Sequence, residues 1–332
     1  MHRKLVAESL GTALLVIVAV GTATLSFGFG LVGESRSAGV VTTALAFGLV
    51  LLCSGCGALT SPDLDPSGPV TLAERRLLFD AVSIMMIVIV PVFIMAALFT
   101  WRYRGTNRNA RYTPNFAYYW PIEILVWGVP AAIIVWLGLH LWGGTHRLDP
   151  YKAIDQGVET VRVDAVAQDW KWLFIYPEQN IAVVNELVFL SGTPLALRIT
   201  SDTVMNSFVI PALGGQIYAM AGMQTRLHLL ADKPGRFMGR NVQYSGRGFA
   251  DQQFDAIATS SKEDFEAWVA RVKASLDTLD AETYEQLAKP SAKVPVTYYS
   301  GVESNLFDKI IAKWRRSDEV DPAPTAAAET AE

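Results

Sequence analysis

The chain has 332 residues, of which 51% are hydrophobic and 18% are charged, and its formal net charge is −4. This composition indicates a membrane protein with a soluble part, and the negative charge argues against a nucleic-acid-binding protein. Haem, zinc and copper centres are built mostly from histidine and cysteine, and the chain has only four histidines and two cysteines. No three of them share a segment at metal-ligand spacing, so we expect no redox centre, metal or other cofactor in this chain.

The first 52 residues contain two apolar strings, "RKLVAESLGTALLVIVAVGTATL", which begins at Arg3, and "ALAFGLVLL", which ends at Leu52. With these strings the segment resembles the start of an aquaporin. Neither of the Asn-Pro-Ala boxes that line the pore of that family occurs in the chain, so we expect no water conduction. A gene fusion, a misplaced start codon or a sequencing frameshift would each account for the junction.

A second apolar stretch, residues 38–55, ends in small residues followed by Cys56. This pattern resembles a lipoprotein signal with Cys56 as the lipidated residue, although Cys53 stands where a leucine is usual. The alternative is an ordinary membrane helix that contains cysteine. We therefore treat residues 1–55 as an aquaporin-like segment with a signal region, and Cys56 as the expected lipidation site.

Two further apolar stretches predict a transmembrane helical hairpin within residues 56–146. Residues 81–100 are uncharged, and twenty helical residues match the roughly 30 Å of a bilayer's hydrocarbon core. Residues 122–142 carry only Glu123 and His140 as ionisable groups. Each stretch contains one proline, which membrane helices tolerate.

The loop between these helices, residues 101–121, contains four arginines and no acidic residue. The positive-inside rule places it in the cytoplasm and everything from Gly143 onward outside. If all four apolar stretches crossed the membrane with Arg3 and Lys4 inside, this loop would lie outside, whereas a cleaved signal agrees with every charge. We expect a multi-pass protein of the bacterial inner membrane with a periplasmic C-terminal domain.

Residues 151–258 predict an all-β domain. Alternation of apolar and polar residues appears at residues 161–165 and 195–199, and short runs of this kind are separated by Gly, Pro and Asn turns. The pattern is typical of an antiparallel β-sandwich or barrel.

Residues 259–316 predict a short helical extension. Ser261, with Asp264 three residues later, resembles a helix start, and residues 280–288 and 305–316 predict two more helices. The last sixteen residues, 317–332, are rich in Ala, Pro and acidic side chains, which predicts a disordered tail.

Two long strings then carry a specific resemblance. They are "DWKWLFIYPEQ", which begins at Asp169, and "MNSFVIPALGGQIYAMAGMQTRLHL", which begins at Met205. With the later "PVTYYSGVESNLFDKII", they resemble subunit II of the haem-copper oxidases, in the bo-type ubiquinol oxidase branch, over residues 51–314. The resemblance implies a membrane α-helical hairpin, an all-β cupredoxin-like sandwich and a short α-helical C-terminal extension.

In the cytochrome c oxidase branch this sandwich carries a dinuclear copper centre, held by two histidines, two cysteines, a methionine and a glutamate carbonyl. The resemblance places those positions on side chains that lack both thiolate and imidazole, the ligands that copper demands. They are the lost copper-ligand positions Asn206, Asn241, Gln243, Ser245, Phe249 and Gln252. The fold is expected to persist without its metal.

The resemblance implies a subunit of a proton-pumping terminal oxidase that oxidises quinol and reduces O2 to water. Haems and copper are expected in partner subunit I, with subunits III and IV, membrane lipid and the quinol pool as further partners and no soluble cytochrome c. No catalytic centre is expected in this chain. The alternatives are a free-standing membrane lipoprotein with a sandwich domain and, disfavoured, a copper-bearing cytochrome c oxidase subunit II.

Glu123 matches the glutamate that marks a proton entrance shared with subunit I in this superfamily. An ionisable group near a membrane end is a functional candidate, although the helix macrodipole alone also favours glutamate at a helix start. The aromatic stretch from Trp170 to Tyr176 is interpreted as sandwich core and subunit packing, and His228 as a packed or hydrogen-bonded side chain.

Overall fold

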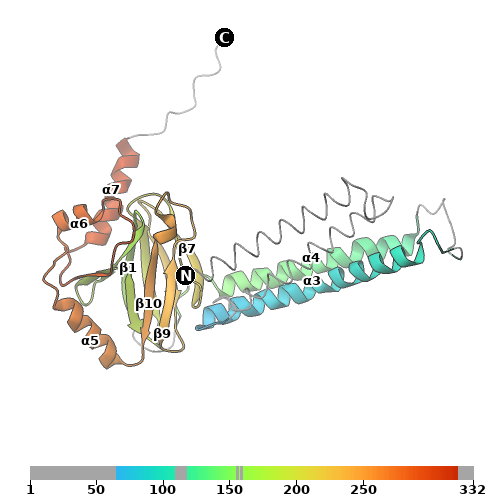
Figure 1. Ribbon diagram of the computed structural model, residues 1–332, viewed down its shortest axis with the longest axis horizontal. Helices are drawn as coiled ribbons and strands as arrows, with labels where there is room; N and C mark the ends of the chain where they lie inside the picture. Colours follow the sequence, from blue (N-terminus) through green and yellow to red (C-terminus); the bar gives the residue numbers. More distant parts are fainter. Residues whose placement is uncertain (1–64, 108, 110–117, 155–156, 158–159, 321–332) are drawn as a thin grey trace, which may run out of the picture. The chain divides into compact units, whose positions relative to one another are not determined.

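The computed structural model describes residues 65–107, 109, 118–154, 157 and 160–320. Residues 1–64, with Cys56 and the aquaporin-like segment, lie outside the described residues, as do 108, 110–117, 155–156, 158–159 and 321–332. In the described part, two long helices, α3 (Pro69–Arg102) and α4 (Trp120–Arg147), precede an eleven-stranded β domain and three C-terminal helices (Figure 1).

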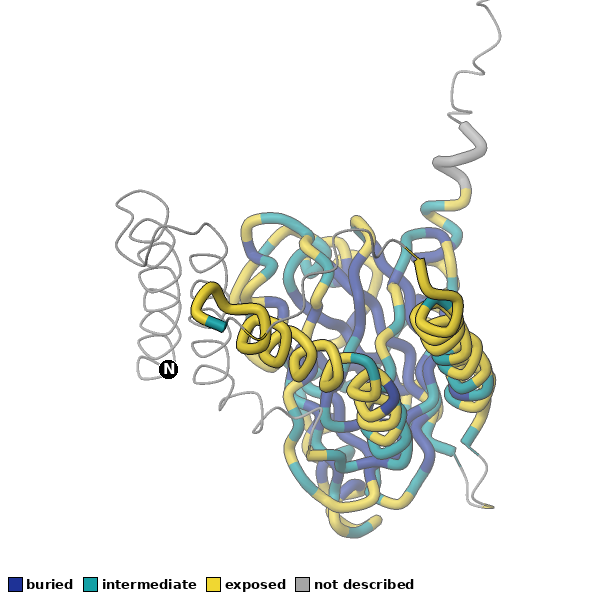
Figure 2. The backbone as a smooth tube through the Cα atoms, turned by 90° about the vertical axis from the view of Figure 1, so that its right-hand side faces the viewer, coloured by how far each residue is buried: buried dark blue, intermediate teal, exposed yellow. Residues whose placement is uncertain are grey.

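Helices α3 and α4 form the expected hairpin and extend past the apolar stretches. Each begins with a proline in its first turn, where the missing N–H has no intrahelical role, and contains one internal proline, Pro91 or Pro130. At 1.5 Å per residue, α3 is about 51 Å long and α4 about 42 Å, so both exceed a hydrocarbon core of about 30 Å. Their apolar side chains are exposed on nearly all faces (Figure 2), which is the pattern of helices that require lipid or protein around them.

The β domain consists of two packed sheets. One sheet has the strand order β11-β3-β2-β1-β5-β8 and the other β4-β10-β9-β6-β7. The strand bounds in the first sheet are β1 Val161–Gln168, β2 Lys171–Tyr176, β3 Ile181–Val184, β5 Leu195–Ser201, β8 Thr225–Leu229 and β11 Thr297–Tyr299. Those in the second sheet are β4 Glu186–Leu190, β6 Asn206–Ile210, β7 Gly214–Ala219, β9 Gly235–Arg240 and β10 Gln253–Thr259.

The sandwich is mixed rather than purely antiparallel, so the expected pairing was partly wrong. Strand β1 is parallel to β5, with Val163 opposite Leu197, and β10 is parallel to β4. The chain leaves the first sheet after β3, forms β4 in the second sheet, and returns to pair β5 with β1. Such crossover pairings join distant segments, and alternation within each strand carries no information about them.

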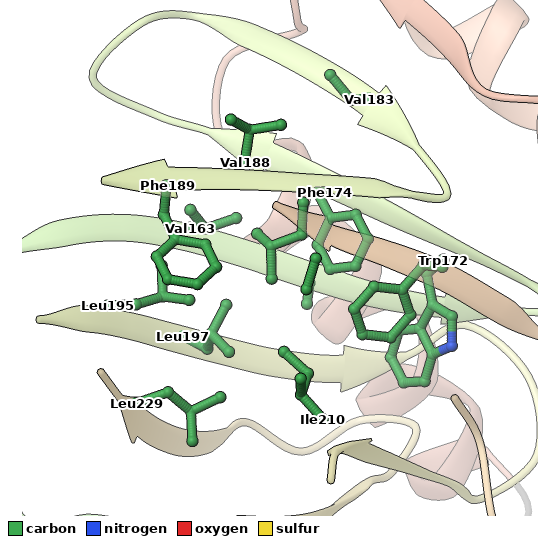
Figure 3. Close-up of a cluster of buried hydrophobic side chains, with 14 of the residues drawn as sticks. Val163, Trp172, Phe174, Val183, Val188, Phe189, Leu195, Leu197, Ile210 and Leu229 are labelled. Atoms are coloured by element: carbon green, nitrogen blue, oxygen red, sulfur yellow. The ribbon is translucent and has the colours of Figure 1, made fainter. Parts of the chain in front are cut away.

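Aromatic side chains fill the space between the sheets (Figure 3). Trp172 and Phe174 of β2 are fully buried, and their rings contact Phe208 and Phe254 of the opposite sheet at centroid separations of 5.0–6.4 Å. Tyr176 is also fully buried, and its hydroxyl donates to the Val188 carbonyl at 2.9 Å and accepts from the Val188 amide at 2.8 Å. The interpretation of this aromatic stretch as sandwich core is confirmed for the three strand residues.

Three helices complete the chain: α5 Lys262–Lys273, α6 Ala281–Leu287 and α7 Leu306–Val320. Ser261 caps α5 by accepting from the Asp264 amide at 3.2 Å, and Asp280 caps α6 in the same way, which fixes both starts where the sequence predicts them. Residues 317–320 continue α7, so the prediction of disorder was wrong for these four residues. They contain neither Gly nor Pro, and the first proline after them is Pro322.

Candidate functional site

A cluster of buried polar side chains lies at the end of the sandwich where β6 begins and β9 ends. Asn206 opens β6, Asn241 follows β9, and Gln252 follows the short 3-10 helix η4 (Phe249–Asp251). Their exposed fractions are only 1%, 4% and 0%. Because an unpaired polar group at this depth is costly, each requires hydrogen-bond partners inside the protein.

Asn241 is the centre of this cluster. Its Nδ2 donates to Asn206 Oδ1 at 2.7 Å, to Gln252 Oε1 at 2.9 Å and to Ser245 Oγ at 3.2 Å. Its Oδ1 accepts from the Ser207 amide at 2.9 Å and from the Ser207 hydroxyl at 3.2 Å. The amide therefore holds β6 and the loop of residues 241–252 together.

The loop takes its path because glycines allow it to pass close to Trp170. A Cβ atom at Gly248 would lie 2.3 Å from the Trp170 ring, and Gly246 has a φ of +108°, which side chains rarely adopt. Trp170 Nε1 in turn donates to the Ser245 carbonyl at 3.0 Å. The loop is thus fixed against the turn that joins β1 to β2.

Four of the six predicted positions meet in this cluster, and two do not. Gln243 contributes only its backbone N–H, which donates to Asn241 Oδ1 at 2.9 Å. The Phe249 ring contacts the exposed Tyr244 ring at 5.8 Å instead. The sequence did not predict a role for Ser207. The only indication of one was its place next to Asn206 in a short strand, and alternation of apolar and polar residues does not show which side chains of that strand face the cluster.

The chemistry of this cluster is that of neutral amides and hydroxyls. These side chains supply no thiolate, imidazole or carboxylate, and the described residues hold no group of three or more His, Cys, Asp or Glu that could bind a metal. The amides satisfy one another, so the cluster acts as a rigid polar joint between strands rather than as a reactive site.

A second group of buried polar side chains, centred on Asp202, joins the sandwich to the C-terminal extension. The sequence did not predict it. The Asp202 carboxylate, with 1% of its side chain exposed, accepts from the Tyr284 hydroxyl, from Lys313 Nζ and from Trp314 Nε1, each at 2.8 Å. Burial, and then the neighbouring Asp202 charge, raises the pKa of Tyr284, which keeps that hydroxyl a hydrogen-bond donor.

Lys171 of β2 makes a comparable junction. It is fully buried, and its Nζ donates to the Lys289 carbonyl at 2.9 Å and to the Ser291 hydroxyl at 2.7 Å. Burial lowers the pKa of Lys171 to about 8. Both junctions bind the segment after α5 to the outer face of the first sheet.

In the hairpin, Glu123 lies in the first turn of α4 and accepts from Trp127 Nε1 at 3.1 Å. Near the other end, His140 Nε2 of α4 lies 3.5 Å from Asp80 Oδ2 of α3.

His228 lies in β8 of the sandwich. Its Nδ1 is 3.1 Å from the Pro150 carbonyl, which confirms the expectation of a hydrogen-bonded histidine.

Comparisons with known proteins agree with this architecture. A family model described as "Cytochrome C oxidase subunit II, periplasmic domain" matches residues 158–253, and one described as "COX Aromatic Rich Motif" matches residues 273–315. Cytochrome bo(3) ubiquinol oxidase subunit 2 of Pseudomonas putida is 50% identical over 265 residues, which cover 80% of this chain and 83% of the relative. Ubiquinol oxidase subunit 2 of Acetobacter aceti is 46% identical over 82% of this chain and 87% of its own.

A more distant relative, quinol oxidase subunit 2 of Bacillus anthracis, is 31% identical over 78% of this chain and 89% of its own. The chain belongs to the quinol oxidase subunit 2 family. The predicted resemblance and fold class are thereby confirmed: the family's periplasmic domain is the cupredoxin-like sandwich, and its aromatic-rich motif covers α6, β11 and most of α7. The relatives are subunits of an oxidoreductase complex.

Asn241→Ala removes the centre of the amide cluster and leaves Asn206, Ser207 and Gln252 without their buried partner. We expect the free energy of unfolding to fall by about 1–3 kcal/mol or more, measured by denaturant unfolding of the full chain in detergent. Gln243→Ala, in the same loop but with its side chain outside the cluster, is the control and is expected to cost less than about 0.5 kcal/mol. Equal losses in both variants would contradict a central role for the Asn241 amide.

Proposed function

We propose that this chain is the second subunit of a proton-pumping quinol oxidase, in which the assembled complex oxidises quinol and reduces O2 to water. The observation that carries the proposal is the buried amide cluster around Asn241. The resemblance assigns to this cluster positions at which the cytochrome c oxidase branch binds copper. The names of the relatives, which cover about four fifths of the chain, support the same function.

The cluster also argues for the route of the electrons. Asn206, Asn241, Ser245 and Gln252 offer amide and hydroxyl groups, which are poor ligands for a copper centre that exchanges electrons. A soluble cytochrome c would therefore find no electron acceptor in this sandwich. Electrons reach the complex from membrane quinol instead, and the haems and copper belong to subunit I.

The parts of the chain then have separate tasks. The exposed apolar faces of α3 and α4 bind subunit I and lipid in the inner membrane, and the sandwich of residues 151–258 caps the complex on the periplasmic side. The extension of residues 259–316 completes the sandwich. Subunits III and IV complete the assembly.

The test is oxygen consumption by the complex, isolated from native membranes through a tag on this chain. We expect respiration with ubiquinol and none with reduced cytochrome c, and we expect haem to co-purify. Respiration with cytochrome c would contradict the proposed electron route. Isolation of the chain without haem, and without respiration on either donor, would favour the free-standing lipoprotein.

Glu123 is proposed to contribute to proton entry. It lies at the helix end nearest the arginine-rich loop, and within the part of the chain that the structure describes its carboxylate accepts one hydrogen bond, from Trp127. A carboxylate in this position costs free energy in a membrane unless it has a task or a partner. Its remaining capacity to accept hydrogen bonds is available to water or to subunit I.

Glu123→Gln keeps the size and the Trp127 contact but removes the titrating group. We expect quinol oxidation to slow severalfold with the haem content of the purified complex unchanged. Glu178→Gln, on the exposed turn between β2 and β3, is the matched control and should leave turnover as it is. Full turnover of the Glu123 variant would contradict a proton role.

Cys56 is proposed to be the lipidated N-terminus of the mature chain. The support is the sequence pattern before it, together with the orientation that a cleaved signal gives the arginine-rich loop. We expect the intact mass to correspond to residues 56–332 plus a diacylglyceryl thioether, and Cys56→Ser to remove that addition. A tryptic peptide from residues 5–36 in the assembled complex would contradict cleavage.

A further inference from the structure

The outer face of the first sheet carries an ordered set of charged side chains on β1, β5 and β8. In one row Arg162 pairs with Ala196, which pairs with His228. In the next row Asp164 pairs with Arg198, which pairs with Arg226. Because residues two apart on a strand share a face, both rows point to the same side of the sheet.

A hollow of about 470 Å³ lies over these rows. Ala196, His228 and the four charged side chains of the two rows line it. The alanine is short, so it leaves space between Arg162 and His228, which flank it in its row. The hollow is therefore built into the sheet by its register rather than by a flexible loop.

The charges in the hollow do not cancel. Arg198 binds Asp164 through two hydrogen bonds of 2.6 and 2.5 Å, lies 3.8 Å from Asp308 of α7 and covers the Phe307 ring at 4.7 Å. Within the described part of the chain, Arg162 and Arg226 form no ion pair. Arg226 also stands directly opposite Arg198, and like charges in that position are destabilising. An anion in the hollow would give Arg162 and Arg226 a partner of opposite charge and would reduce the repulsion between Arg226 and Arg198.

The hollow also lies near the membrane end of the sandwich. His228 lies against Pro150, three residues after α4 ends at Arg147. The five residues from Gly143 to Arg147 raise that end about 8 Å above the apolar stretch, and the headgroup layer is about 5–8 Å thick. On the proposed membrane placement of the hairpin, this puts His228 close to the lipid headgroups, and Arg226 lies two residues from it on β8.

We propose that this hollow is a binding site for a phosphate group, supplied by an anionic phospholipid or by free phosphate. Guanidinium groups form paired hydrogen bonds with phosphate oxygens, and two unpaired ones face the same space. Arg198 also lines the hollow, and its two hydrogen bonds to Asp164 hold its side chain in place. The lipid source depends on the proposed membrane placement of the hairpin, whereas the binding of free phosphate does not.

The test uses the purified complex with three versions of this chain. Arg162→Gln with Arg226→Gln removes the two unpaired guanidinium groups. Arg162→Lys with Arg226→Lys keeps the charge and removes the planar fork. Lys233→Gln with Arg240→Gln removes two exposed charges, from the turn after β8 and from the end of β9, that form no ion pair with the described residues, and is the control for general attraction to anions.

Two measurements distinguish a phospholipid headgroup from free phosphate as the ligand. Titration with inorganic phosphate in neutral detergent is expected to show saturable binding that weakens about tenfold or more in the Gln variant, less in the Lys variant and not in the control. Complexes are then placed in nanodiscs of phosphatidylcholine with one fifth phosphatidylglycerol, extracted, and their retained phosphatidylglycerol is measured by mass spectrometry. Loss of one retained molecule in the Gln variant alone assigns the site to lipid, and equal retention assigns it to free phosphate.

Equal phosphate binding and equal lipid retention in the wild type and the Gln variant would overturn the proposal. So would a wild-type complex that binds no phosphate while the Gln variant loses a neighbouring subunit, because the hollow would then hold an acidic side chain of that subunit. Haem content, measured for every version, shows whether assembly is intact.

Discussion

Strand β2 must be covered on both faces, and much of the structure follows from that constraint. All six residues from Lys171 to Tyr176 are buried. Trp172, Phe174 and Tyr176 point into the space between the sheets, whereas Leu173 and Ile175 belong to a second apolar cluster on the outer face. A sandwich alone buries one face of each strand, so β2 requires a third layer. The extension supplies that layer with Tyr299, Phe307 and Ile310.

The third layer is held by polar groups as well as by apolar contacts. Asp202 and Lys171 are buried ionisable side chains of the sandwich, and the partners of both come from residues after 283. Without the extension each would be buried unpaired or would turn to solvent, and either result would disturb the sheet. The extension is therefore part of the folded domain. The hollow lined by Arg162, Arg198 and Arg226 lies on the part of this outer face that the extension does not cover.

The sequence predicted the elements that depend on local patterns. The hairpin, strands β1 and β5, and the capped starts at Ser261 and Asp280 all rest on periodicity or on side chains within a few residues, and they were found where expected. The parallel pairing of β1 with β5 was not predicted, because register between segments more than thirty residues apart leaves no local mark. The amide cluster was located by resemblance, but its hydrogen bonds depend on side-chain conformations that no motif specifies. Asp202 was missed because its partners are 82 to 112 residues later in the chain.

That separation also affects the order in which the domain is completed. At a synthesis rate of about 5–20 residues per second, the partners of Asp202 emerge roughly 4 to 22 s after it does. Sandwich strands can pair within that interval, since such pairing takes at most seconds. The outer face of β2 would then be exposed to solvent while the last segment is still being made. A chain that stops before Tyr284 would keep this apolar face uncovered, and the cell would encounter it as an incompletely folded surface suited to capture by chaperones or proteases.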